Sequence, residues 1–238
     1  MTVAVVTGGS TGIGAAICAR MLAAGHHVVS LSRRPSLDAR CEHVEVDLYD
    51  AVATAQAAQS IAQRHAISHV VHNAGAIRAR PLPDVGTEDI AALAQLHLNA
   101  ALALVQAALP AMRAAGFGRI ILVSSRAALG LATRTAYSAT KAGMIGMART
   151  WALELAHDQI TVNVVAPGPI RETEMFYAVV PADSEREAAL AAAIPVKRLG
   201  IPADVAEAVM FFAGPGSGFI TGQTLFVCGG SSVGSLTI

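Results

Sequence analysis

Short β-branched runs alternate with alanine-rich stretches along this chain, and no other feature restricts its fold more. The runs at 3–7, 28–32, 44–48, 68–73, 119–125, 160–166 and 224–228 have strand character, and the stretches at 11–24, 51–65, 88–115, 137–157 and 202–213 have helical character. Such alternation favours a parallel sheet, because each helix carries the chain back across the sheet. Right-handed crossovers place these helices on both faces. We therefore predict an α/β fold with a doubly wound three-layer α/β/α arrangement and about seven strands.

The length and composition agree with one core that is covered on both sides. The 238 residues, 53% of them hydrophobic and 14% charged, suffice for a single domain over residues 1–238. One segment breaks the rhythm of strands and helices, since residues 171–198 are polar and bounded by prolines. An insertion after a strand of a parallel sheet lies above the carboxyl ends, where ligands bind. We interpret this segment as a substrate loop.

The charge balance and the cysteines exclude several classes of protein. The 17 basic and 17 acidic side chains give a formal net charge of +0, so the charge does not favour nucleic acid or an anionic membrane as a partner. The 3 cysteines, Cys18, Cys41 and Cys228, form no metal or redox motif and indicate a reducing, cytoplasmic setting. The 8 histidines show no metal-binding spacing, so we expect no metal site.

The stretch from Ile90 to Met112 has no acidic, lysine or arginine side chain, and its length would allow it to span a membrane. It nevertheless contains polar residues such as Gln95, a proline at Pro110, and mostly alanine and leucine elsewhere. We interpret it as a helix of a soluble protein that is buried on most sides, and we expect no membrane contact.

A glycine-rich turn follows the first expected strand and opens the first expected helix. Its sequence, TGGSTGIG over residues 7–14, lets the backbone turn sharply and approach a ligand closely. The helix end offers free N–H groups and the positive end of its dipole to a phosphate. The turn is not a P-loop, because alanines follow where lysine and serine or threonine are required. It is either a tight junction or a dinucleotide site that would use Gly8, Ser10, Thr11, Gly12, Ile13 and Gly14.

The end of the second expected strand bears on which dinucleotide would bind. A carboxylate there would bond the ribose 2′-hydroxyl of NAD and repel a 2′-phosphate. The chain instead has Ser32-Arg33-Arg34, and two guanidinium groups suit a phosphate. Unless Arg33 and Arg34 only decorate a surface loop, we expect NADP(H) to be preferred over NAD(H).

A tyrosine and a lysine stand four residues apart where a long helix is expected to begin. Tyr137 and Lys141 would therefore lie on one face of that helix. An ammonium group near a phenol lowers the pKa of the tyrosine, which can then exchange a proton with a substrate oxygen near neutral pH. A hydroxyl at the end of the preceding strand, from Ser124 or Ser125, would hold the same oxygen.

Together these segments resemble the short-chain dehydrogenase/reductase family, and the similarity covers nearly the whole chain. The family's TGxxxGIG turn, NAG segment, YxxxK motif and PG segment have counterparts at 7–14, 73–75, 137–141 and 167–168. The resemblance implies a Rossmann-like fold and an NADP(H)-dependent oxidoreductase that interconverts a ketone and a secondary alcohol by hydride transfer. In function it points to members similar to 3-oxoacyl-[acyl-carrier-protein] reductase.

The resemblance also implies a role for each matching residue. Tyr137 would be the general acid in reduction and the base in oxidation, while Ser125 would orient the carbonyl. Lys141 would bind the nicotinamide ribose and lower the pKa of the tyrosine, and Asn99 would help to hold a proton-relay water beside the lysine. Further contacts with the cofactor would come from Asp47, Leu48, Asn73, Ala74, Gly75, Pro167, Gly168, Ile170 and Thr173.

The substrate stays open at this level. A 3-oxoacyl thioester, a sugar, a cyclic alcohol and an aromatic ketone all suit the family chemistry, and a non-catalytic nucleotide-binding scaffold is the alternative outside enzymes. Arg78, Arg80, Arg126 and Arg134 lie near motif residues in the sequence, and we hypothesise that some attract an anionic substrate instead of only facing solvent. Because the family commonly forms tetramers, the resemblance also implies a homotetramer or homodimer.

Overall fold

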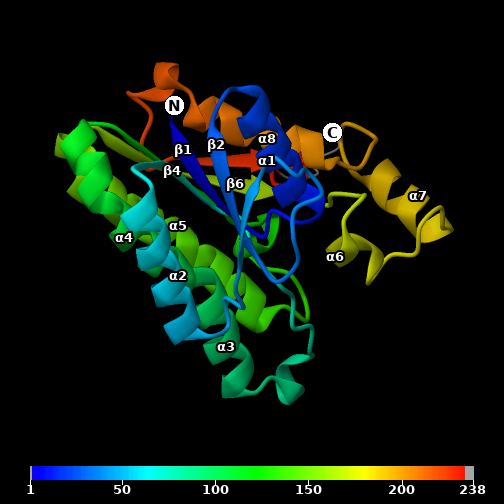
Figure 1. The fold of residues 1–238 in the computed structure, drawn as a ribbon. Coiled ribbons are helices and arrows are strands. Elements are labelled where there is room, and N and C mark those ends of the chain that lie inside the picture. The colour runs from blue at the N-terminus through cyan, green and yellow to red at the C-terminus, as the bar shows by residue number, and fades with distance from the viewer. Residues whose placement is uncertain (1, 234–238) are drawn as a thin grey trace.

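The computed structural model describes residues 2–233, which contain one sheet of seven parallel strands (Figure 1). The strands are β1 Val3–Thr7, β2 His27–Ser32, β3 Glu42–Glu45, β4 Ile67–His72, β5 Gly118–Val123, β6 Ile160–Pro167 and β7 Thr224–Val227. Their order across the sheet is β3-β2-β1-β4-β5-β6-β7. The chain reverses its progress across the sheet between β1 and β4, so the crevice at their carboxyl ends is the expected place for a ligand.

Helices cover both faces of this sheet (Figure 1). Those of the described residues are α1 Gly12–Ala23, α2 Ala51–Arg64, α3 Thr87–Ala94, α4 Ala100–Ala115, α5 Thr135–Leu155, α6 Glu174–Tyr177, α7 Glu185–Ala193 and α8 Pro202–Ala213. α1 and α8 pack together on one face, and α2, α4 and α5 cover the other. The predicted doubly wound three-layer α/β/α arrangement is confirmed.

Alternating side chains of the strands fill two cores, one on each face of the sheet. In β1, Val3 and Val5 face the helices α2, α4 and α5, whereas Ala4 and Val6 face α1 and α8. The inner strands are therefore apolar at almost every position, which is typical of a parallel sheet that is covered on both sides. This arrangement fixes the carboxyl edge of the sheet as a rigid platform for loops.

The helix expected over 88–115 is interrupted in the structure. Residues Gln95–Asn99 form a π-helical segment between α3 and α4. The run Thr87–Ala115 is the one stretch of residues 2–233 that is long and apolar enough to cross a membrane, by length and composition alone, and 44% of its most apolar window is buried. Leu104 and Met112 of α4 lie in the core against the sheet, so α4 is a core helix that is less buried than the sequence suggests.

The third strand ends earlier than the sequence predicts. β3 spans Glu42–Glu45 and pairs only with β2, whereas the sequence favours a strand over 44–48. The chain leaves the sheet after Glu45, because Asp47 accepts a hydrogen bond from the N–H of Tyr49 at 3.1 Å and Asp50 then caps α2. This turn brings Asp47 and Leu48 above the carboxyl ends of the strands.

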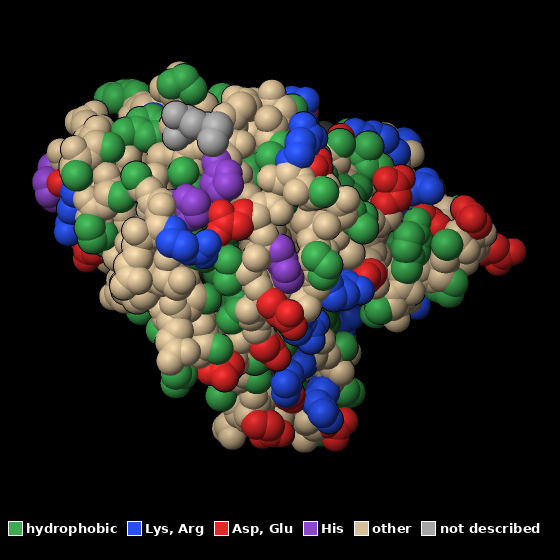
Figure 2. Space-filling view, viewed as in Figure 1, with side chains coloured by type: hydrophobic (Ala, Val, Ile, Leu, Met, Phe, Trp, Pro, Cys, Tyr) green, Lys and Arg blue, Asp and Glu red, His purple; other side chains and the backbone are tan. Residues whose placement is uncertain are grey.

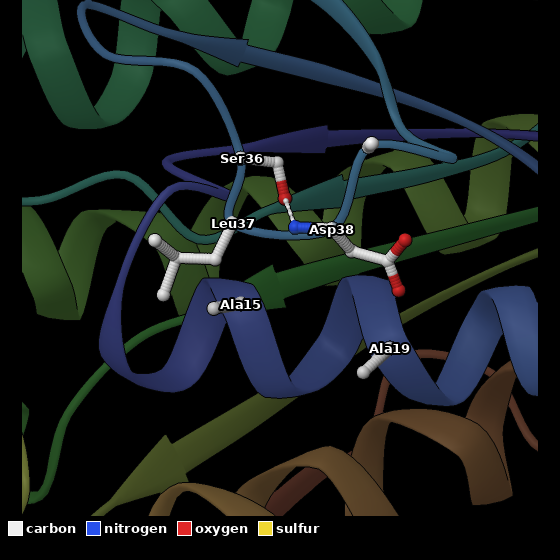
Figure 3. Close-up of a pocket in the computed structure, with 6 residues that line it drawn as sticks. Ala15, Ala19, Ser36, Leu37 and Asp38 are labelled. Atoms are coloured by element: carbon white, nitrogen blue, oxygen red, sulfur yellow. Dashed lines mark hydrogen bonds between the residues drawn. The ribbon is translucent and has the colours of Figure 1, made fainter.

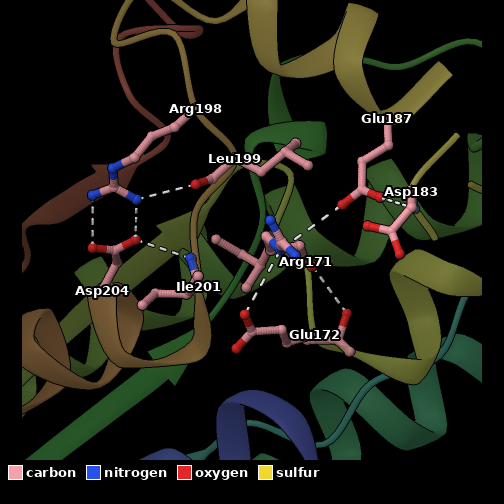
Figure 4. Close-up of polar contacts among 10 residues, drawn as sticks. Arg171, Glu172, Asp183, Glu187, Arg198, Leu199, Ile201 and Asp204 are labelled. Carbon is pink, nitrogen blue, oxygen red and sulfur yellow. Dashed lines mark hydrogen bonds and ion pairs between the residues drawn. The ribbon is translucent and has the colours of Figure 1, made fainter. Parts of the chain in front are cut away.

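The predicted substrate loop contains α6 and α7, which project beyond the sheet (Figure 1). Polar contacts hold its two ends (Figure 4). Arg171 lies between Glu172 and Glu187, with its Nε 3.8 Å from the Glu187 carboxylate. At the other end, the Arg198 guanidinium donates two hydrogen bonds to Asp204, at 2.7 and 2.9 Å. The loop is therefore tied to its own stem and to the start of α8.

Candidate active site

The glycine turn after β1 has the backbone conformation that the sequence indicates. Gly8 and Gly12 have φ angles of +67° and +53°, which side chains rarely allow. A Cβ atom at Gly14 would lie 1.9 Å from the carbonyl oxygen of Gly8. The turn therefore leaves a cradle free of side chains at the start of α1, where backbone N–H groups point outward. This geometry fits the pyrophosphate of a dinucleotide.

The hydroxyl of Thr7 ties this turn to the end of β4, a contact that the sequence reasoning missed. Thr7 Oγ1 accepts hydrogen bonds from the N–H groups of Asn73 and Ala74, at 3.0 and 2.9 Å. The Asn73 side-chain amide in turn donates to the carbonyl oxygens of Thr7 and Gly8, at 3.1 and 3.3 Å. Asn73 thus fixes the shape of the turn with its side chain, and Gly75 follows at the same edge.

The two arginines after β2 are both exposed, and one of them has an acidic partner from the substrate loop. The Arg34 guanidinium donates to both carboxylate oxygens of Glu174, the first residue of α6, at 2.9 Å. This contact holds the pKa of Glu174 below its usual range. Both side chains are more than half exposed, so the pair contributes little to stability and a stronger anion can replace the carboxylate. Arg33 has no ion-pair partner within the described chain.

A hollow of about 370 Å³ lies between α1 and the segment Ser36–Ala39, which follows these arginines in the chain (Figure 3). Ala15 and Ala19 of α1 form one wall, and Ser36, whose hydroxyl accepts a hydrogen bond from the N–H of Asp38 at 3.4 Å, forms the other. A second hollow of about 510 Å³ lies between β7 and residues 194–200. Tyr137 lines neither hollow, so the site is defined by its side chains and not by these two hollows.

Tyr137, Lys141 and Ser125 come together at the carboxyl end of β5, as the sequence predicts. Tyr137 and Lys141 are both buried on one face of α5, and the Lys141 Nζ lies 5.7 Å from the centre of the tyrosine ring. Lys141 Nζ donates a hydrogen bond to the carbonyl oxygen of Val123 at 2.7 Å. A hydrogen bond with Ser125 acts on the Tyr137 hydroxyl. We call Ser125, Tyr137, Lys141 and the neighbouring His97 the active-site cluster.

The structure distinguishes the two serines that the sequence leaves open. Ser124 is buried, and its hydroxyl donates to the carbonyl oxygen of Lys141 at 2.7 Å, which ties β5 to α5. Ser125 faces Tyr137, and its Oγ accepts a hydrogen bond from the N–H of Ala127 at 3.1 Å. Ser125 is therefore the hydroxyl that can reach an oxygen bound beside the tyrosine.

The pKa values of Tyr137 and Lys141 differ from the expectation that the lysine ammonium lowers the pKa of the tyrosine. Burial raises the pKa of Tyr137, and the hydrogen bond with Ser125 and the charge of Arg134 lower it by less. Burial also lowers the pKa of Lys141 to about 7. Lys141 donates to a backbone carbonyl oxygen and not to the phenol, so the expected lowering of the tyrosine pKa by its ammonium does not apply in this state.

His97 lies behind the tyrosine, where it packs in the core as its place next to a motif position suggests. It is fully buried, its ring lies 5.7 Å from that of Tyr137 in an edge-on arrangement, and its Nδ1 lies 2.8 Å from Thr140 Oγ1. Because the Thr140 hydroxyl donates to the Ala136 carbonyl oxygen, His97 Nδ1 carries the proton and Nε2 accepts from the N–H of Ala76 at 3.3 Å. Burial keeps the pKa of His97 far below its usual value, so the ring is neutral.

Asn99 does not reach the cluster, which corrects its expected role as the relay residue. Its side chain is exposed and donates a hydrogen bond to Gln95 Oε1 at 3.1 Å. The π-helical turn contains an extra residue and therefore changes which side chain of Gln95–Asn99 points inward. A side chain added at Gly75 would meet both His97 Nε2, at 3.2 Å, and Lys141 Nζ, at 3.4 Å. His97 is thus the π-segment residue that lies beside the lysine.

The remaining expected cofactor residues line the same carboxyl edge. Pro167 ends β6, and Gly168 follows it so closely packed against Cys228 that a Cβ atom would lie 2.8 Å from the cysteine Cβ. Ile170 is buried at the start of the substrate loop. Thr173 approaches the glycine turn, since its Cγ2 lies 3.1 Å from the position of a Cβ atom at Gly12. These contacts place the substrate loop directly over the turn.

Two of the four arginines considered for an anionic substrate are already engaged. Arg78 and Arg80 each contact the buried carboxylate of Asp89, at 3.1 Å. Arg134 stands one turn before Tyr137 at the start of α5, and its Nε is buried without a hydrogen-bond partner among the described residues. Arg126 directly follows Ser125 and forms no ion pair within residues 2–233. Arg126 and Arg134 therefore remain the candidates for attracting an anionic substrate.

Comparison with known proteins places this arrangement in context. A family profile described as enoyl-(acyl carrier protein) reductase matches residues 8–232. The BbsC subunit of (2S)-[(R)-hydroxy(phenyl)methyl]succinyl-CoA dehydrogenase from Thauera aromatica is 44% identical over 175 residues, or 74% of this chain and 67% of BbsC. The 3-oxoacyl-[acyl-carrier-protein] reductase MabA from Mycobacterium bovis is 35% identical over 231 residues, or 96% of this chain and 92% of MabA.

A solved structure agrees with this similarity. A protein from Beutenbergia cavernae, assigned as an NAD(P)-dependent gluconate 5-dehydrogenase, is 33% identical and superposes with a TM-score of 0.90. The match covers 98% of this chain and 97% of that protein, whose crystal structure holds NADP at low occupancy. The likeness in sequence and in fold therefore extends over almost the whole chain.

Proposed function

The chain belongs to the short-chain dehydrogenase/reductase family, and on this basis we propose that it reduces the ketone of a 3-oxoacyl thioester with NADPH. Because its relatives are named as dehydrogenases and reductases, the chain is an oxidoreductase that interconverts a ketone and a secondary alcohol. The observation that carries the proposal is the buried hydroxyl of Tyr137 beside Ser125 and Lys141, at the carboxyl edge of the sheet and next to the glycine turn.

The proposed chemistry assigns one task to each group of the active-site cluster. The glycine turn and the carboxyl edge of the sheet would hold NADPH, which would supply the hydride for the reduction. Tyr137 donates its proton to the carbonyl oxygen as negative charge develops there, and the raised pKa of the phenol keeps that proton in place beforehand. Ser125 donates a second hydrogen bond to the same oxygen and orients it. The buried surroundings exclude water and strengthen both interactions.

Lys141 and His97 lie behind the tyrosine and connect it with the rest of the site. The pKa of Lys141, near 7, allows the amine to exchange protons at neutral pH and to return one to the phenolate. His97 accepts from the Ala76 N–H and lies next to the lysine, so we propose that it, in place of Asn99, shapes the space around Lys141.

A preference for NADP(H) over NAD(H) is supported by the exposed guanidinium groups of Arg33 and Arg34. A 2′-phosphate carries more charge than the Glu174 carboxylate and would take its place on Arg34. The variant Glu174→Gln removes this competitor and should bind NADPH more tightly while leaving NADH affinity unchanged, in a fluorescence titration. Equal effects on both nucleotides would show that Arg34 does not select between them.

The thioester substrate is supported by the named activities of the relatives. BbsC is a subunit of a dehydrogenase named for a coenzyme A thioester that carries a hydroxyl group, and MabA is named for 3-oxoacyl groups on a carrier protein. Both carriers are anionic, and Arg126 and Arg134 offer cationic groups beside Ser125 and Tyr137. The substrate loop above the glycine turn would close over the acyl chain.

A second candidate substrate is a keto sugar acid. The observation that favours it is the overlap with the gluconate 5-dehydrogenase fold over 98% of this chain. A sugar acid also carries a carboxylate, which the same arginines suit. It differs from a thioester in lacking a long apolar chain.

The experiment that separates these candidates is a comparison of kcat/KM with NADPH for acetoacetyl-coenzyme A and for 5-ketogluconate. We expect the thioester to be the better substrate by at least about tenfold, with a KM that rises in Arg134→Ala. A higher kcat/KM for the sugar acid would overturn the thioester proposal and keep the oxidoreductase. No turnover with any ketone, despite NADPH binding, would favour the non-catalytic scaffold.

We further propose a cytoplasmic homotetramer or homodimer. Large apolar side chains stay exposed on α4 and α5, among them Leu102 and Leu153, and a second copy of the chain would cover them. The three cysteines are free thiols, which agrees with a reducing compartment. Light scattering at micromolar concentration tests the assembly, and a monomer would contradict it.

A further inference from the structure

A cluster of two histidines and a glutamate lies at the amino edge of the sheet, away from the glycine turn. His27 begins β2, Glu42 begins β3, and His65 follows the last residue of α2. The Nε2 atoms of His27 and His65 each lie 2.9 Å from the same oxygen of Glu42, Oε2. One ligand atom from each residue lies within 4.8 Å of the others. In Figure 2, histidine side chains gather beside acidic and basic side chains near the start of β2.

We propose that His27, Glu42 and His65 bind a divalent transition-metal ion, with zinc as the best match. Two imidazole nitrogens and one carboxylate oxygen form a ligand set that zinc accepts, with water in the fourth position. The three ligand atoms already converge, so the site needs a contraction and no rearrangement of the chain. Metal binding requires the Nε2 atom of each histidine to be free of its proton, so each coordinated ring would carry its proton on Nδ1.

Neighbouring groups prepare the carboxylate for this role. Arg64 donates a hydrogen bond to the other oxygen of Glu42, Oε1, and its own Nε donates to the carbonyl oxygen of Ser60 at 3.2 Å. Glu42 is thus held by one oxygen while Oε2 stays directed at the histidines. The Arg64 guanidinium lies beside the carboxylate, and its positive charge disfavours a metal ion there. The adjoining C-terminal end of α2, with its partial negative charge, acts in the opposite direction.

The burial of the cluster suits a site that is reachable and sheltered. The side chains of His27, Glu42 and His65 are 27%, 24% and 20% exposed. The His27 and His65 rings lie 4.9 Å apart, centre to centre, and are tilted by 37° to each other. A bound ion would join β2, β3 and α2, and would thereby stiffen the edge strand β3, which pairs with β2 alone.

The proposal differs from what the sequence indicates, and the reason is topological. His27 and Glu42 are 15 positions apart along the chain, and Glu42 and His65 are 23 positions apart, so no short sequence motif predicts the cluster. Parallel pairing of β2 with β3 and the return of α2 bring them together only in the folded chain. The site lies at the opposite edge from Tyr137, and the proposal is independent of the proposed reductase activity.

The test is a zinc titration of the full-length protein after removal of metal by a chelator, read by competition with a chromophoric zinc indicator. We expect one equivalent to bind, and binding to weaken at least about tenfold in Glu42→Gln and in His65→Gln. Glutamine at 65 keeps a hydrogen-bond donor for Glu42 but supplies no metal ligand, so it separates metal binding from loss of the network. The control His157→Ala, which alters an exposed histidine elsewhere, should bind zinc as the wild type does.

Two further measurements complement the zinc titration. Cobalt(II) in place of zinc should give a visible absorption spectrum of a four-coordinate ion that is absent in His65→Gln. The rate of NADPH oxidation should be the same with and without chelator. Absence of one-equivalent binding in the wild type, or equal affinity in His65→Gln and the wild type, would overturn the proposal and leave the cluster as a hydrogen-bonded network.

Discussion

At the scale of single residues, the two serines at the end of β5 have the same chemistry and different surroundings. Ser124 donates to the Lys141 carbonyl oxygen inside the core, whereas Ser125 faces Tyr137. We expect Ser125→Ala to lower kcat by about 10²-fold or more and to cost about 1 kcal/mol of stability, because its hydroxyl also accepts from the Ala127 N–H. Ser124→Ala should cost about 1 kcal/mol of stability and leave kcat nearly unchanged. Steady-state kinetics and urea unfolding of both variants check this, and the reverse pattern would exchange their roles.

His97 gives a second prediction at this scale. Its nitrogens link Thr140 with the Ala76 N–H, beside Lys141, and phenylalanine would keep a flat, somewhat larger ring while removing both links. We expect His97→Phe to bind NADPH normally, to lower kcat by about tenfold and to move the pH at which kcat falls.

Asparagine at 97 keeps hydrogen-bonding groups and should restore much of the rate, in a pH–rate profile recorded for all three proteins. A purely structural role for His97 predicts that both variants lose stability and keep the wild-type pH profile.

The sequence indicates much of this residue-level picture and misses a particular part of it. The glycine turn, Tyr137, Lys141 and a serine at the end of β5 come together as their spacing predicts. His97 lies beside Lys141, where Asn99 was expected, because regular helical spacing does not predict a π-helical turn. The position of Thr7 under the turn is also invisible in the sequence, because its partners belong to β4.

At the scale of elements, the junction between β1 and α1 depends on glycine at specific positions. A Cβ atom at Gly14 would lie 1.9 Å from the Gly8 carbonyl oxygen, so Gly14→Ala must displace the turn. We expect this variant to lose most of its NADPH affinity and to unfold at a lower temperature. The matched control is Gly146→Ala in the middle of α5, where no atom lies within 4 Å of the new methyl group.

The control should gain up to about 1 kcal/mol of stability, because alanine favours a helix over glycine. Thermal unfolding and fluorescence titration of both variants provide the measurement. Normal NADPH binding by Gly14→Ala would contradict the cradle that we describe.

Elements with strong periodicity are predicted well, and those set by tertiary contacts are not. The sequence places α8 at 202–213, which agrees with its observed bounds, because Pro202 opens it and an apolar pattern fills it. The short helices α6 and α7 lie in a polar segment without such a pattern, and they depend on caps from Thr173 and Ser184. The early end of β3 likewise follows from the turn at Asp47 and not from its apolar residues.

At the scale of the whole molecule, buried neutral histidines make stability depend on pH. Burial lowers the pKa of His72 to about 3 and that of His69 to about 4. The unfolded chain binds these protons at about pH 6.5, so it holds more protons than the folded chain below that pH. The stability that these neutral histidines contribute is therefore present above about pH 6.5, and it is lost as the pH falls toward 4 and then 3.

This linkage gives a quantitative expectation. For each of the two histidines, the free energy of unfolding should be about 2 kcal/mol lower at pH 5 than at pH 7. Urea unfolding at both pH values measures the difference, and His69→Gln should show a smaller one than the wild type. His157→Ala, which changes an exposed histidine, serves as the control. Equal stability at pH 5 and pH 7 would contradict the burial of neutral His69 and His72.

The proposed reductase activity depends most directly on Tyr137, so the decisive measurement is a comparison of Tyr137→Phe with the wild type. Phenylalanine keeps the buried ring and removes only the hydroxyl that would protonate the substrate. NADPH binding is followed by fluorescence, and turnover is followed by NADPH consumption with acetoacetyl-coenzyme A. We predict unchanged NADPH affinity and a loss of about 10²-fold or more in kcat. Turnover that survives at the wild-type rate would contradict the assignment of Tyr137 as the acid and the mechanism built on it.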